Sequence, residues 1–185
     1  MRHIKEIMIV AVCLMVLSFC VCTGFGIYFM YREGVQEYED LRTYVKETDE
    51  DDHTEGTDGS DGKQTVVDFK ALKKINPDVV SWITIPGTNI DYPLLQGKDN
   101  NQYLHKDMEG RDSAAGAIFL DHGDKADLSS LHNIIYGHHM KNGTMFKDIV
   151  KYKDQQYFDE HQDIILYTPD REIHLKALAA VVTSP

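Results

Sequence analysis

Cysteine is scarce in this chain, which contains only Cys13, Cys20 and Cys22 and none from residue 23 onward. A domain built from the later residues can therefore hold neither a disulfide framework nor a cysteine-ligated metal site. All three cysteines lie in one apolar run near the N-terminus. This position predicts small apolar residues within a membrane, and acylation of one of them near a membrane face is the alternative.

Positive charge is also in short supply, because 19 Lys and Arg face 30 Asp and Glu, giving a formal net charge of -11. Nucleic-acid binding calls for a basic patch, so this balance argues against it. The excess is uneven. Residues 1–63 hold 6 basic and 13 acidic residues, whereas residues 64–185 hold 13 and 17. Most of the excess acid therefore lies outside the predicted folded domain.

Charge is missing altogether from Ile7 to Met30, a run of 24 residues. As a helix this run would measure about 36 Å, enough to cross a hydrocarbon core of about 30 Å. We expect residues 1–6 to form a short cytoplasmic tail and residues 7–30 an uncleaved transmembrane signal anchor. Basic residues flank the run on both sides, so charge alone does not fix its orientation.

The next residues, 31–63, are predicted to form a polar, acidic stalk and linker. From Tyr31 to Lys46 the pattern permits a helix with Tyr38, Leu41 and Val45 on one stripe. The stretch Glu47 to Lys63 has eight acidic residues and no aliphatic or aromatic residue, which predicts a flexible linker. It lacks the spacing of an EF-hand calcium loop.

Residues 64–185 have the pattern of a small, mainly β domain. Val66, Phe69, Leu72 and Ile75 fall at helical spacing, and Pro77 ends that helix. Short helices are also predicted at residues 143–152 and 154–161. Six short apolar runs bounded by turn residues predict strands: 79–85, 90–95, 116–121, 132–138, 163–169 and 172–182. Many short strands with few long helices favour a β-barrel or sandwich.

The stretch "NIIYGHHMKNGTMF" begins at Asn133 and contains two adjacent histidines. If its first residues are extended, Tyr136 and His138 share one face and His139 lies on the other, so the pair is poorly placed for one metal site. His138 is the better candidate for proton transfer near neutral pH, with a structural hydrogen bond as its alternative role. His139 fits an exposed loop residue. Motifs such as GxSxG, the P-loop, GxGxxG and HExxH are absent.

Three segments in succession, "NPDVVSWITIPGTNIDYPLLQGKDNNQYLHKDMEG", "GAIFLD" and "NIIYGHHMKNGTMFKDIVKY", resemble a class B sortase. The resemblance runs from about Phe69 to Thr183. It implies an eight-stranded β-barrel with added N-terminal helices, in a cysteine transpeptidase at the cell membrane of a Gram-positive bacterium. Such an enzyme has a single membrane pass and an extracellular catalytic domain. It cleaves the sorting signal of a secreted protein without a cofactor and passes the protein to an amine of a peptidoglycan precursor or a pilin.

By the same resemblance, His138, directly after Tyr-Gly, is the catalytic histidine, and Tyr136 lines the substrate groove with Asn100 or, alternatively, Asn101. The family's cysteine lies on the seventh strand and its arginine on the eighth. This sequence reaches only the sixth strand. We therefore expect an incomplete barrel that is truncated before the catalytic cysteine and arginine and is inactive alone. A non-catalytic remnant that binds sorting signals or a partner is the alternative, and a membrane-tethered structural β-domain is a third hypothesis.

Overall fold

The computed structural model describes residues 2–49 and 63–183. It divides the chain into two compact units, Met1–Glu37 and Tyr38–Pro185. The second unit thus begins within the residues expected to form a stalk. The predicted flexible linker falls mostly on residues 50–62, which lie outside the described residues.

Helix α1 spans Arg2–Arg42. Its segment Ile7–Gly26 is long and apolar enough to cross a membrane, judged by length and composition, and none of that segment is buried within the structure. This is the one helix among the described residues that meets those criteria. Within the described residues the first unit is helical, and those of its apolar side chains that the structure describes are exposed.

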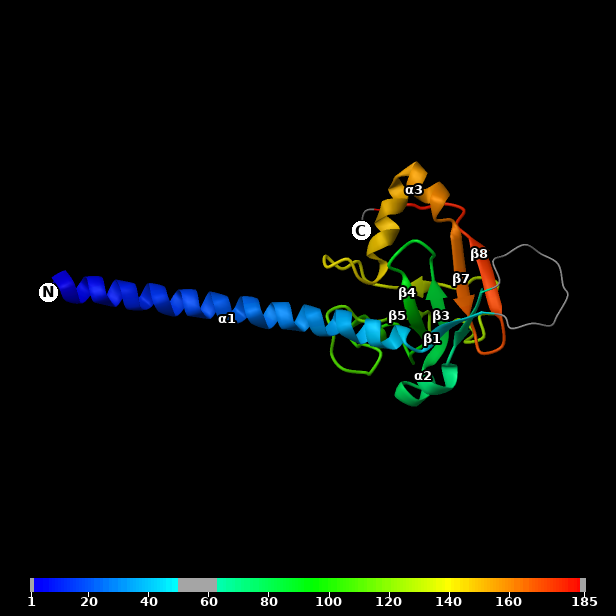
Figure 1. The fold of residues 1–185 in the computed structure, drawn as a ribbon, viewed down its shortest axis with the longest axis horizontal. Helices are drawn as coiled ribbons and strands as arrows, with labels where there is room; N and C mark the ends of the chain where they lie inside the picture. Colours follow the sequence, from blue (N-terminus) through cyan, green and yellow to red (C-terminus); the bar gives the residue numbers. More distant parts are fainter. Residues whose placement is uncertain (1, 50–62, 184–185) are drawn as a thin grey trace. The chain divides into compact units, whose positions relative to one another are not determined.

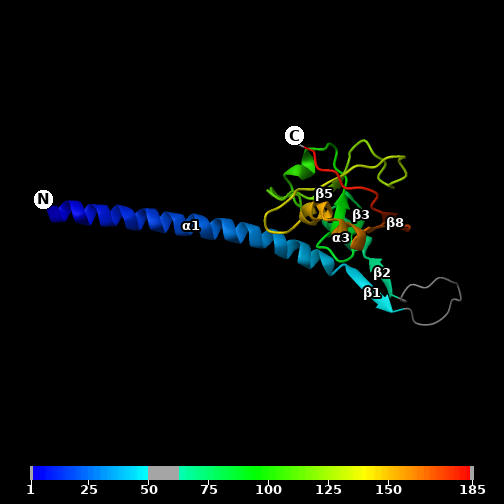
Figure 2. The same ribbon diagram turned by 90° about the horizontal axis from the view of Figure 1, so that it is seen from above.

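A two-stranded antiparallel sheet follows α1 in the chain, formed by β1 (Val45–Asp49) and β2 (Lys63–Val67) (Figure 2). Helix α2 (Phe69–Ile75) comes next, and the carboxylate of Asp68 caps it by accepting a 2.9 Å hydrogen bond from the Ala71 amide. The predicted helical stripe began at Val66, but this residue pairs in β2. The backbone N–H and C=O groups near Val66 are therefore hydrogen-bonded between β1 and β2 and are not available to a longer helix.

The main sheet has six strands in the order β6-β5-β4-β3-β7-β8. Figure 1 labels all of these strands except β6. Every neighbouring pair is antiparallel except β4 and β5, which are parallel. The strands are β3 (Val79–Thr84), β4 (Asp91–Leu95), β5 (Ile118–Leu120), β6 (Ile135–Tyr136), β7 (Asp163–Tyr167) and β8 (Glu172–Lys176). The prediction of a mainly β fold with short inserted helices is confirmed.

Three short helices complete the described elements: η1 (Gln102–Leu104), η2 (Phe146–Lys153) and α3 (Gln155–Glu160). The helix predicted at residues 143–152 is a 3₁₀-helix that begins three residues later. Strand β6 is shorter than the predicted strand 132–138, so His138 lies beyond its end. The centre of the core is apolar and fully buried, and its largest side chains are Trp82, Tyr92, Tyr103 and Phe119.

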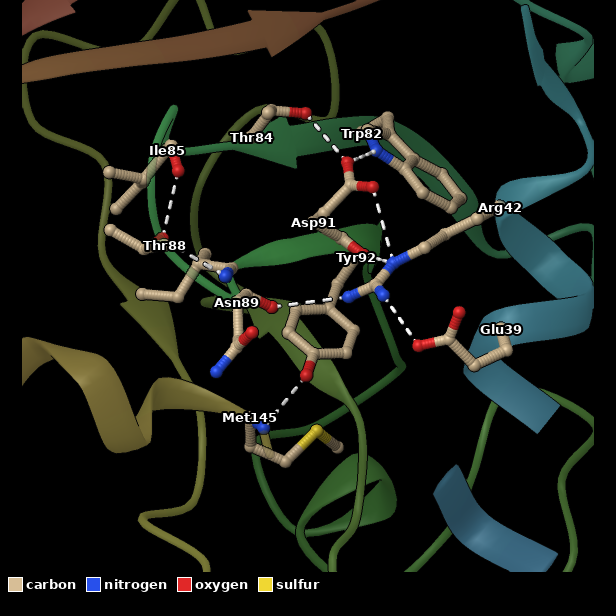
Figure 3. A network of polar contacts seen from close by, with 11 residues as sticks. Glu39, Arg42, Trp82, Thr84, Ile85, Thr88, Asn89, Asp91, Tyr92 and Met145 are labelled. Atoms are coloured by element: carbon tan, nitrogen blue, oxygen red, sulfur yellow. Dashed lines mark hydrogen bonds and ion pairs between the residues drawn. The ribbon is translucent and has the colours of Figure 1, made fainter. Parts of the chain in front are cut away.

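The end of α1 belongs to this core, because Tyr38 and Leu41 are both buried in it. The Arg42 guanidinium ties the same helical turn to β4 (Figure 3). Its Nε lies 3.2 Å from a carboxylate oxygen of Asp91, and its Nη2 donates to the carbonyl of Asn89 over 3.3 Å. The other Asp91 oxygen accepts a 2.7 Å hydrogen bond from the indole of Trp82. One carboxylate thereby joins helix and sheet.

Candidate functional site

The predicted catalytic histidine, His138, is half-buried, and its ring Nε2 forms a 2.8 Å hydrogen bond with the carbonyl oxygen of Leu104. A carbonyl oxygen can only accept, so Nε2 carries the hydrogen in this arrangement. Among the described residues, the other ring nitrogen has no hydrogen-bond partner. That nitrogen is therefore the one left to exchange a proton with a bound molecule.

The Leu104 carbonyl is positioned by its neighbour Tyr103, whose side chain is buried under η1. The Tyr103 hydroxyl donates to a carboxylate oxygen of Asp78 over 2.7 Å and accepts from the side-chain amide of Asn76 over 2.9 Å. Burial, and after it the bond to Asp78, raises the pKa of Tyr103 to about 12. The phenol stays protonated at neutral pH and anchors η1 beside His138.

His139 has different surroundings from its neighbour. Its side chain is exposed, and its Nε2 lies 3.0 Å from the ammonium nitrogen of Lys147, which can only donate. Its backbone forms an isolated antiparallel bridge with Met145. The two adjacent histidines thus contact separate parts of the chain, and His138 alone faces η1.

The two predicted groove residues, Tyr136 and Asn100, meet at one carboxylate that the sequence did not single out. The Tyr136 hydroxyl donates to Oδ2 of Asp121 over 3.0 Å, and the Asn100 amide nitrogen donates to the same oxygen over 2.7 Å. The Tyr136 ring stacks on Phe119, with centroids 5.1 Å apart. Asp121 directly follows β5, and its place at the end of a strand was the signal available in the sequence.

The hydrogen bonds at Asp121 fix the charge states of this group. Donation from the Gly123 amide, then from Asn100 and Tyr136, lowers the pKa of the Asp121 carboxyl, so it is ionised at neutral pH. The same bond raises the pKa of the Tyr136 phenol, which stays protonated. Tyr136 and Asn100 are therefore both hydrogen-bond donors to a fixed anion.

The orientation of the Asn100 side chain follows from both of its contacts. Its nitrogen donates to Asp121, and its oxygen accepts a 2.9 Å hydrogen bond from the His122 amide. One amide hydrogen of Asn100 remains to be offered to a ligand. The alternative residue, Asn101, is exposed, and its backbone amide donates to the carboxylate of Asp99. The structure thus brings Asn100, and not Asn101, to the partner of Tyr136.

Within Tyr38–Pro185, the described residues supply no cysteine beside His138. The three cysteines all belong to α1, in the unit Met1–Glu37. Arg111 pairs with Asp107 at 2.8 Å, and Arg171 donates to the carbonyl of Asp127. Within the described ranges, no three His, Cys, Asp or Glu side chains form a group that could hold a metal ion.

No family model matches the sequence. Among curated proteins, Sortase B of Listeria monocytogenes is 44% identical over 94 residues, which cover 51% of this chain and 38% of that protein. Sortase B of Staphylococcus aureus is 35% identical over 116 residues, which cover 63% of this chain and 48% of that protein. The chain therefore spans less than half the length of the curated relatives that it matches.

Solved structures agree with these relatives. Sortase B of Bacillus anthracis, in complex with AAEK1, has a TM-score of 0.67 at 28% identity, over 85% of this chain and 74% of that one. The sortase B–substrate complex of Staphylococcus aureus has a TM-score of 0.54 at 37% identity and covers 58% of this chain. Sequence and fold point to one family and support a class B sortase, of which this chain spans only part of the length.

Proposed function

We propose that this chain is part of a membrane-anchored sortase that cleaves a C-terminal sorting signal and joins the protein to an amine of a peptidoglycan precursor or a pilin. The observation that carries the proposal is the arrangement around His138. One of its ring nitrogens is held by the Leu104 carbonyl, and Tyr136, two residues away, shares Asp121 with Asn100. The candidate proton-transfer residue, His138, thus lies two residues from Tyr136, which with Asn100 donates hydrogen bonds to the Asp121 carboxylate.

In the proposed reaction, a cysteine thiolate attacks the carbonyl carbon of the scissile peptide bond. The carbon–nitrogen bond then breaks, the leaving amine takes a proton from the His138 imidazolium, and a thioester remains. An acceptor amine then attacks the thioester carbonyl carbon and gives a proton to the now neutral His138 imidazole, so that a new amide bond forms, the carbon–sulfur bond breaks and the thiolate is released. The hydrogen bond to Leu104 fixes the His138 ring for the proton transfer.

The proposed substrates are secreted proteins that carry a sorting signal. Tyr136 offers an aromatic face held on Phe119, and Asn100 offers its remaining amide hydrogen to a peptide carbonyl. The apolar segment Ile7–Gly26 supports an N-terminal membrane anchor. The position of the second unit outside the cell is proposed from the resemblance to class B sortases. The likeness to a sortase B–substrate complex of Staphylococcus aureus supports a substrate-binding role for this region.

A chimera tests the role of His138. The chain is extended after Pro185 by a C-terminal segment of the Listeria relative, and transfer of a sorting-signal peptide to an amine is assayed. Replacing His138 by Ala should lower kcat by about 10²- to 10⁴-fold, the usual contribution of a general acid. His139→Ala, a matched change one residue away, should stay within about threefold. Equal losses in both variants, or none at His138, would refute the assignment.

We expect the 185-residue chain to form no thioester by itself, because all three of its cysteines lie at or before Cys22, in the apolar N-terminal run. The full 185-residue chain, incubated with a sorting-signal peptide, should give no acyl adduct in intact-mass spectrometry. Binding of the labelled peptide without cleavage, weakened by Tyr136→Ala, would favour the second candidate function, a peptide-binding module. An adduct on a cysteine of this chain would contradict the expectation.

A further inference from the structure

Met145 has an unusual backbone conformation near His138. Its φ is 58° and its ψ is -137°, and within the described ranges Leu128 is the other non-glycine residue with positive φ. Its side chain is completely buried. A methionine in this region of backbone space is strained and persists only when its surroundings hold it there. Such outliers are concentrated at functional sites, which makes the contacts of Met145 informative.

Tyr92 supplies the strongest of these contacts. Its hydroxyl accepts a 3.0 Å hydrogen bond from the Met145 amide (Figure 3). The Tyr92 ring lies in the middle of the sheet on β4, 2% exposed, and the Tyr38 ring packs against it edge-on at 5.0 Å. Burial raises the pKa of the Tyr92 phenol, so it stays neutral. A rigid part of the core therefore fixes the strained amide.

The turn at Met145 holds the backbone on both sides of His138. The Phe146 amide donates to the His138 carbonyl over 2.9 Å, and Met145 bridges His139. The Phe146 ring also packs directly on Gly137. A Cβ atom at Gly137 would lie 2.7 Å from the ring and 2.4 Å from the side chain of Ile118, distances that real Cβ atoms essentially never show.

These contacts form a continuous path from the core to the site. Tyr92 fixes the Met145 amide, and Met145 with Phe146 fixes the His138 backbone. The ring of His138 can reach the Leu104 carbonyl at 2.8 Å only while its backbone stays in place. Because the turn at Met145 is strained, losing the bond to Tyr92 should let it relax to another conformation.

We propose that Tyr92 and Met145 are positioning residues for His138, and that the buried hydroxyl of Tyr92 sets the orientation of the imidazole by holding the strained turn. The proposal rests on the proposed function, in which His138 transfers the proton. Neither residue touches the substrate in this scheme. Tyr92 and Met145 act by holding the His138 imidazole in one orientation. A general loss of stability would not change that orientation in the folded protein.

The test uses the full chain in detergent micelles, with histidine rings labelled with ¹⁵N and the His138 signals assigned by their loss in His138→Gln. Wild type should show His138 with its hydrogen on Nε2. In Tyr92→Phe, the second tautomer should appear or the signals broaden, and the Phe146 amide should exchange with solvent at least tenfold faster. Tyr152→Phe is the matched control, because it removes another tyrosine hydroxyl that is hydrogen-bonded to the backbone, in this case as a donor to the carbonyl of His161.

Unchanged His138 signals in folded Tyr92→Phe would overturn the proposal, and so would equal changes in Tyr152→Phe. If Tyr92→Phe does not fold, wild type alone still decides. The amides of Met145 and Phe146 should then exchange at least a hundredfold more slowly than that of Lys141, and equal rates would refute the restraint. None of these readouts involves a substrate. A chimera whose activity is independent of His138 would overturn the proposed function separately.

Discussion

Replacing Leu41 by Ala tests whether the end of α1 is part of the folded domain. Leu41 is 5% exposed within the core, although its place in the sequence lies between an apolar helix and an acidic stretch. Truncating a buried leucine costs about 2–5 kcal/mol, from lost transfer free energy and from the cavity that remains. Tyr38 and Arg42 hold the same helical turn on the sheet and limit its collapse. We therefore expect a free energy of unfolding about 3–4 kcal/mol lower.

Urea unfolding of the full chain in detergent micelles measures this change. Trp82 is the one tryptophan of the sequence and is fully buried, so its fluorescence reports loss of the core. With an m-value of about 2 kcal/mol/M, the midpoint should fall by about 1.5–2 M urea.

The same substitution at Leu131, whose side chain is fully exposed, serves as the control and should change the free energy of unfolding by less than about 0.5 kcal/mol. Equal midpoints for the Leu41 and Leu131 variants would show that the helix end does not pack in the core.

Three further predictions concern residues around the site. Gly137→Ala should lower the free energy of unfolding by about 1–3 kcal/mol in urea titration, because its Cβ would overlap Ile118 and Phe146, and an unchanged midpoint would contradict the packing. The lowered pKa of Asp121 means that its carboxylate stabilises the fold above the ordinary carboxyl pKa of about 3.9. The stability advantage of wild type over Asp121→Asn should therefore be full near pH 6 and shrink as the pH falls through the lowered pKa; a constant difference would refute it. The pKa of Tyr103, raised to about 12, predicts the opposite trend, since the folded state retains a proton that the unfolded chain loses. The difference in the free energy of unfolding between wild type and Tyr103→Phe should be full below pH 10 and decline toward pH 12. The same difference at pH 9 and at pH 11, measured by urea denaturation, would count against it.

Local patterns predicted the central strands closely. Strands β3 and β4 lie within one residue of the predicted runs 79–85 and 90–95. Both are short apolar runs on either side of the turn "PGTN", so neighbouring residues alone specify them. The strand predicted at 132–138 was too long for a nonlocal reason. The Ile134 amide donates to Asp124 and the His138 carbonyl accepts from Phe146, so loops satisfy the backbone beyond β6.

Contacts between distant segments were harder to anticipate. The role of Asp121 depends on Asn100 and Tyr136, which approach it from other parts of the chain. In sequence, Asp121 was marked only by its place at the end of a predicted strand. Likewise, nothing local marks Tyr92 as the acceptor for the Met145 amide, 53 residues further along the chain. The family pattern selected His138, while the groups that orient it required the folded structure.

The single parallel pair in the sheet, β4 with β5, has a consequence for folding kinetics. Parallel neighbours cannot be joined by a tight hairpin, so the chain must return through the long crossover 96–117 before they pair. The loop-closure entropy is lost before the strand contacts form, which makes this step slow. Asn100 and Leu104 lie on that crossover, and Tyr136 lies on β6, which pairs with β5. The proposed substrate wall should therefore assemble late, in the same kinetic phase as closure of the sheet.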